Sequence, residues 1–203
     1  MTADERAARA ALSATVEPGT VSVARRIRSD GVEATWHAVA TGRAGLDPAE
    51  ATEQRAEQVD GAAILAAAEA DRIRFICPGD EEWPGALDSM VDTLDVSTEP
   101  VPPPFGLWVR GSADLGVACA RAVAVVGSRA STRYGQRVAS DLGADLALAG
   151  WTVVSGAAFG IDAAAHRGAL ALGGATLAVM ACGVDVAYPR AHAELLDRIL
   201  AQG

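Results

Sequence analysis

A glycine, a serine and an arginine follow directly on a short apolar run. Residues 122–126 read AVAVV, and Gly127, Ser128 and Arg129 come next. Glycine lets backbone N–H groups approach an anion closely, and the guanidinium group of arginine donates forked hydrogen bonds to phosphate oxygens. This order of residue types indicates a phosphate-binding turn at the end of a buried strand. In a single loop, the same residues also fit an ordinary strand-to-helix turn that carries a surface charge.

Two further apolar runs end in the same way. WTVVS, at 151–155, leads into GAAFGID, and TLAVMA, at 176–181, leads into CGVDVAYPR. Three such ends favour an anion site over ordinary turns. Tyr188, in the last of them, either stacks on a base or covers the sheet edge. The predicted phosphate-binding residues are Gly127, Ser128, Arg129, Ser131, Ser155, Gly156, Gly160 and Arg190.

Helical segments alternate with these runs. We expect the helices at 134–150, 162–174 and 192–202. Alternation of helices with fully apolar strands is typical of a parallel sheet in an α/β domain, here half of a doubly wound fold, whose ligand crevice lies beyond the carboxyl ends of the strands. Helical periodicity predicts that the buried face of the first helix consists of Val138, Leu142, Leu146 and Ala149.

Asp162 and His166 stand four residues apart at the start of the second helix. Such a pair lies on one helix face and fits either a pair of ligands or an acid/base pair. The alternative, which we favour, is structural: Asp162 caps the helix and His166 packs or hydrogen-bonds to a nearby loop. No third ligand follows at a clear spacing, so we predict no metal. The GxGxxG and GxxxxGK[ST] patterns are absent, so we predict no nucleotide cofactor.

Composition divides the chain into three parts. Residues 1–70 are alanine-rich, and Gly31 and Gly42 each mark the expected end of a helix. This pattern predicts a small helical domain that serves as a scaffold or an interaction module. Residues 71–120 predict a linker with short strands and a proline-rich stretch. Residues 121–203 form the predicted α/β domain.

Charge and cysteine content limit the class of protein. The net charge is −9, but residues 121–203 hold seven arginines against six carboxylates, and the chain has no lysine. A local anion site is therefore compatible with an acidic chain. No apolar run is long enough to span a bilayer, and the N-terminus shows no signal peptide. Cys77, Cys119 and Cys182 are widely spaced, as is typical of reduced thiols in a cytoplasmic protein.

Taken together, the segments VVGSRASTRYG, SGAAFGIDAAAHRGAL and CGVDVAYPRAH resemble the DNA-processing protein A (DprA, or Smf) family. The resemblance implies a Rossmann-like domain preceded by a small SAM-like helical domain. It implies a protein that binds single-stranded DNA and helps to load RecA recombinase, as in natural transformation. The DNA-contacting arginine of the family falls on Arg129, with Gly127, Ser128, Ser155 and Gly156 around it, and a second basic residue falls on Arg190.

The chain departs from the family pattern in two places. His192 stands where the family usually has asparagine, and the chain stops at Gly203, before the second half of the family's sheet and its homodimer surface. The expected form is a truncated member, for which the resemblance does not imply full activity. The alternative is a nucleotide phosphoribohydrolase of the cytokinin-activating (lysine-decarboxylase-like) family. It shares the early glycine–serine loop, but its PGGxGTxxE segment is absent and no carboxylate stands at an obvious nucleophile position. We therefore expect a binding protein rather than an enzyme.

Overall fold

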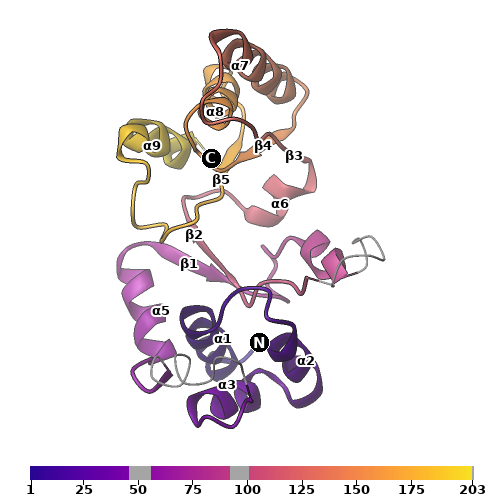
Figure 1. Cartoon of the computed structure of the whole chain (residues 1–203), viewed down its shortest axis with the longest axis vertical. Helices are drawn as coiled ribbons and strands as arrows, with labels where there is room; N and C mark the ends of the chain where they lie inside the picture. The colour runs from indigo at the N-terminus through magenta and orange to yellow at the C-terminus, as the bar shows by residue number, and fades with distance from the viewer. Residues whose placement is uncertain (46–55, 92–100, 203) are drawn as a thin grey trace. The chain divides into compact units, whose positions relative to one another are not determined.

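The chain folds into two compact units, Met1–Val109 and Arg110–Gly203 (Figure 1). The computed structural model describes residues 1–45, 56–91 and 101–202. Much of the predicted proline-rich stretch lies outside the described residues. The three-part division that composition suggests stays a prediction about domains.

The first unit is mainly helical. Its described elements are α1 (Ala3–Thr15), α2 (Val21–Asp30), α3 (Val32–Ala40), α5 (Gly61–Ala70), the strands β1 (Ile73–Ile76) and β2 (Leu107–Arg110), and the 3-10 helix η1 (Gly85–Val91). Leu12, Val23 and Val39 are almost fully buried in its core. The helix end predicted at Gly31 is confirmed, because Gly31 is the C-cap residue of α2 and has a φ of 86°.

The second unit is a three-stranded parallel sheet with helices packed against it. Its elements are α6 (Leu115–Ala120), β3 (Ala122–Ala124), α7 (Arg133–Leu148), β4 (Thr152–Ser155), α8 (Ile161–Ala171), β5 (Thr176–Ala178), η2 (Arg190–His192) and α9 (Ala193–Gln202). The strand order is β3-β4-β5, with Val153 of β4 aligned with Val123 and Thr176 of its neighbours. The predicted Rossmann-like α/β fold is confirmed.

α7 and α8 pack against each other and against the sheet (Figure 1). A Cβ atom on Gly143 of α7 would overlap the carbonyl oxygen of Ala165, and one on Gly168 of α8 would overlap that of Ser140. The two helix backbones therefore come together at glycines. The predicted buried face of α7 is wrong in part, because Val138 and Leu142 are each 46% exposed.

The described residues contain no helix that is both long enough and apolar enough to cross a bilayer. Cys77, Cys119 and Cys182 are all free thiols. Burial raises the pKa of the Cys77 thiol to about 11, so this group stays protonated at neutral pH.

Candidate functional site

The first predicted loop leaves the sheet at the end of β3. The amide of Val125 still donates to the carbonyl of Val154 at 2.9 Å, which carries the pairing one residue past the strand. Gly127, Ser128 and Arg129 then lie exposed. The Arg129 side chain makes no hydrogen bond or ion pair with any residue that the structure describes. Its five N–H donors are therefore available to a ligand.

The second loop, between β4 and α8, packs directly on the first. The amide of Ile161 donates to the carbonyl of Ser128 at 3.3 Å. Gly160 has a φ of 83°, and a Cβ atom there would overlap the same carbonyl oxygen. A Cβ atom on Gly127 would in turn lie 2.8 Å from the side chain of Ile161. The two loops can meet only because glycine occupies both positions.

Ser131 and Ser155 differ in what their hydroxyl groups contact. Ser155 is 2% exposed, and its Oγ donates to the carbonyl of Val125 at 2.5 Å. This hydroxyl therefore joins the end of β3 to β4. Its partner is a backbone carbonyl group and not the phosphate that the sequence predicts. The Oγ of Ser131 is buried without a hydrogen-bond partner among the residues that the structure describes.

Asp162 holds the second loop in place instead of capping α8. The cap prediction is wrong, because Gly160 is the N-cap residue and Asp162 falls inside the first turn. The left-handed backbone of Gly160 lets the helix begin at Ile161. The Asp162 carboxylate, 6% exposed, accepts a hydrogen bond from the amide of Gly156 at 3.2 Å. This bond ties the end of β4 to the start of α8.

His166 is fully buried beneath this loop. Its Nδ1 lies 2.7 Å from the Oγ1 of Thr176, which itself donates to the carbonyl of Val153 at 2.8 Å. Because the threonine proton is already used, Nδ1–H of the neutral imidazole is the donor. Burial lowers the pKa of His166 to about 4, so the ring is neutral at physiological pH. His166 thus links α8 to β5 in the sheet.

The third loop, between β5 and α9, is joined to the second by His192. The Nδ1 of His192 lies 2.9 Å from the carbonyl oxygen of Ala157 and donates to it, and its ring centroid lies 4.6 Å from that of Phe159. Arg190 and Tyr188, in the same loop, are exposed. We call the three loops together, residues 125–131, 155–162 and 182–192, the strand-end site. The hydrogen bond from Ile161 to Ser128 joins the first loop to the second, and the one from His192 to Ala157 joins the third loop to the second.

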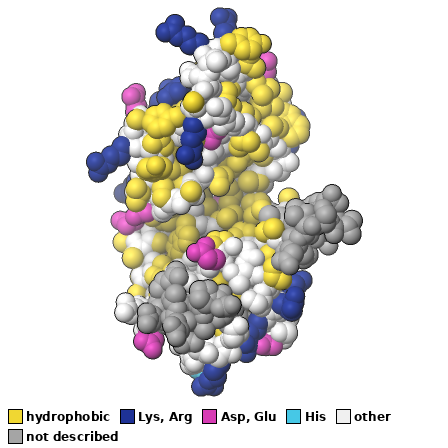
Figure 2. All heavy atoms as spheres, in the orientation of Figure 1, with side chains coloured by type: hydrophobic (Ala, Val, Ile, Leu, Met, Phe, Trp, Pro, Cys, Tyr) yellow, Lys and Arg dark blue, Asp and Glu magenta, His cyan; other side chains and the backbone are white. Residues whose placement is uncertain are grey.

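On the face drawn in Figure 2, separate arginine side chains of the second unit stand among hydrophobic ones. Like that of Arg129, the Arg190 side chain has no ion pair or hydrogen bond with a described residue. No group of three or more possible metal ligands occurs within the described ranges. The strand-end site therefore offers two unpaired guanidinium groups held on glycine-rich loops, which suits an anionic ligand.

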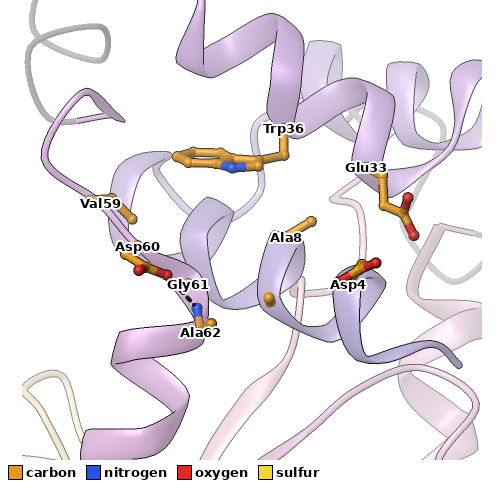
Figure 3. A pocket seen from close by; sticks show the side chains of 9 residues that line it. Asp4, Ala8, Glu33, Trp36, Val59, Asp60, Gly61 and Ala62 are labelled. Carbon is orange, nitrogen blue, oxygen red and sulfur yellow. Dashed lines mark hydrogen bonds between the residues drawn. The ribbon is translucent and has the colours of Figure 1, made fainter.

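The first unit contains an open hollow of about 440 Å³ beside the ring of Trp36 (Figure 3). Three carboxylates stand around it: Asp4, Glu33 and Asp60. Each lies at the start of a helix, and Asp60 caps α5 by accepting from two backbone amides. Carboxylates at these positions stabilise helix N-termini, which accounts for them without a ligand. The strand-end site is therefore the stronger candidate.

The fold and the strand-end site together define a Rossmann-like protein with loops suited to a phosphate group. Over residues 74–203 the chain matches the family described as DNA recombination-mediator protein A, and it belongs to that family.

Similar proteins extend the match toward the N-terminus. The chain is 40% identical over 193 residues to a putative DNA processing protein DprA of Mycobacterium tuberculosis, covering 95% of this chain and 50% of that protein. It is 32% identical over 136 residues to the DNA processing protein DprA of Bacillus subtilis, covering 67% of this chain and 42% of that protein.

A solved structure shares the fold. The X-ray structure of DNA processing protein A from Streptococcus pneumoniae has a TM-score of 0.68 and 27% sequence identity, covering 98% of this chain and 64% of that chain. The present chain thus spans about half the length of the curated relatives it matches.

Proposed function

We propose that the strand-end site binds the backbone of single-stranded DNA, with Arg129 as the principal phosphate contact and Arg190 as a second. One observation carries the proposal: the first two loops are fixed against each other at Gly160, while the guanidinium group of Arg129 stays exposed and unpaired among the described residues. A loop whose backbone is already fixed loses little backbone entropy when an anion docks on its arginine.

The proposed role is binding rather than catalysis. Asp162 is the buried carboxylate of the strand-end site, and it is already bonded to the Gly156 amide. It is therefore poorly placed to act as a nucleophile on a nucleotide. Phosphate contacts made by arginine release counterions from the DNA, so the affinity should fall steeply as salt rises.

Arg129→Ala tests the proposal most directly. We expect the affinity for a single-stranded oligonucleotide to fall by about 1–3 kcal/mol, the scale of a charge-assisted hydrogen bond. The slope of log K against log salt should become shallower by roughly one unit, because one phosphate contact is lost. The measurement is a fluorescence anisotropy titration at several salt concentrations, alongside a thermal melt.

Arg121→Ala is the matched control. It removes the same unit charge at the amino end of β3, where Arg121 lies 5.0 Å from the ring of Trp151 and donates to the carbonyl of Ala149. This variant should lose stability and keep its affinity for DNA. Equal losses of affinity in the two variants would show that only net charge matters, and would refute a specific contact at Arg129.

We further propose that the bound strand is passed to RecA in the cytoplasm, in keeping with the recombination-mediator family. The test is the rate of DNA-dependent ATP hydrolysis by RecA on single strands coated with single-strand-binding protein. Adding this chain should shorten the lag before hydrolysis, and the Arg129→Ala variant should not. A chain that binds DNA but leaves the lag unchanged would overturn the loading role and leave the binding proposal standing.

A further inference from the structure

The exposed aromatic side chains of this protein all lie at one end of the sheet. Of the nine aromatic residues in the sequence, the three that are exposed are Tyr134, Phe159 and Tyr188, at 79%, 49% and 66%. Tyr134 is in the first turn of α7, directly after the first loop, and the other two lie in the second and third loops. We call these three residues the strand-end aromatics.

Phe159 is the most informative of the three. Tyrosine has a hydroxyl group that water can solvate, whereas phenylalanine is wholly apolar, so exposing half of it to water is unfavourable. Its loop is fixed on both sides, by Gly160 against Ser128 and by the bond from His192 to the carbonyl of Ala157. The loop therefore holds an apolar ring in water, and it contacts both the loop of Arg129 and the loop of Arg190.

The Phe159 ring is also supported from behind. The ring of His192 lies 4.6 Å from it, tilted by 56°, and His192 itself is only 5% exposed. The contact with the buried His192 ring holds the Phe159 ring in place. Its exposed face is therefore preorganised for a flat apolar partner. The bases of single-stranded DNA are such partners, because every base has a π-face.

We propose that the strand-end aromatics, with Phe159 as the central member, form a subsite on which unpaired bases of single-stranded DNA stack. This inference rests on the proposed function and adds to it the feature that selects single strands. Arginine contacts to phosphate do not distinguish a single strand from a duplex, whereas in a duplex the base faces are already covered by their neighbours. Stacking is open only to a single strand.

The first experiment compares Phe159→Ala with the wild-type chain on two probes, a 15-nucleotide thymidine oligomer and an abasic oligomer of the same length. The variant should bind the thymidine oligomer roughly 5- to 150-fold more weakly, the range for loss of one stacked base. Its affinity for the abasic oligomer, and the salt dependence for both probes, should stay as in the wild type, because no phosphate contact is removed.

Three further variants control for side-chain volume and position. Phe159→Trp keeps an aromatic face and should keep the affinity, whereas Phe159→Leu keeps apolar bulk and should lose most of it. Leu172→Ala removes a side chain that is 50% exposed, almost the same as Phe159, at the opposite end of α8. It should bind both probes as the wild type does. Thermal melts of all four variants show whether any loss comes from unfolding.

Photo-crosslinking gives a direct readout of the stacked base. An oligomer with a single 5-iododeoxyuridine should crosslink to Phe159, and the crosslink should disappear in Phe159→Leu. A wild-type chain that binds both probes equally, together with an unaffected Phe159→Ala, would overturn the stacking subsite and leave phosphate binding intact. A wild-type chain that binds neither probe would overturn the proposed function and the subsite together.

Discussion

Gly143→Ala should destabilise the second unit by about 3 kcal/mol, the upper part of the range for overpacking a close contact. The added methyl group would overlap the carbonyl oxygen of Ala165, which belongs to the backbone of α8 and cannot rotate away. α7 and α8 would have to separate, and the core between them and the sheet would loosen. The gain in helix propensity from glycine to alanine, about 1 kcal/mol, offsets only part of this cost.

Gly135→Ala is the control for that change, because it is the same substitution in the same helix. A Cβ atom at Gly135 would lie 3.5 Å from the nearest side-chain atom of Ile161, an ordinary van der Waals contact. This variant should be as stable as the wild type or slightly more so. Urea denaturation followed by circular dichroism measures both. If Gly143→Ala proves as stable as Gly135→Ala, the close contact between α7 and α8 at Gly143 is wrong.

That crossing also explains why helical periodicity predicted the wrong inner face for α7. The pattern of large apolar residues favoured Val138 and Leu142 as the inner face of α7, but Ala139 and Gly143 are the residues buried there. Large side chains normally mark a buried face because they fill the space between elements. Here the space is so narrow that small residues make the contact. The signal in the sequence was the pair of glycines within two helices, Gly143 and Gly168.

The strand-end site was predictable to the level of the loops. Parallel strands end at the same edge of a sheet, so a correct α/β pattern brings the loops after β3, β4 and β5 to that edge. The hydrogen-bond partners within the loops were not predictable. Ser155 bonds to Val125, 30 positions earlier in the sequence, and Asp162 bonds to Gly156 instead of the helix. Such choices depend on packing distances of a few tenths of an ångström, which residue types do not encode.

The second large effect should follow from Gly160→Ala. Its φ of 83° is unfavourable for any residue with a Cβ atom, and that atom would overlap the carbonyl oxygen of Ser128. Backbone strain alone costs about 1–3 kcal/mol. The overlap adds a further penalty that only separation of the first two loops can relieve. Because Arg129 follows Ser128, the backbone that carries its side chain would lose its fixed position.

We therefore expect Gly160→Ala to lower the affinity for single-stranded DNA by more than about tenfold, in excess of 1.4 kcal/mol, as well as lowering the melting temperature.

Gly173→Ala separates the effect of backbone strain from the effect of the overlap. Gly173 also has a positive φ, 67°, but a Cβ atom there would meet nothing within 4 Å, and it lies after the far end of α8. It shares the backbone strain without the overlap, so it should lose stability and bind DNA normally. Anisotropy titrations at a temperature where both variants are folded decide the matter. Normal DNA binding by Gly160→Ala would mean that the contact between the two loops does not position Arg129, because the strained loop would then bind as well as the native one.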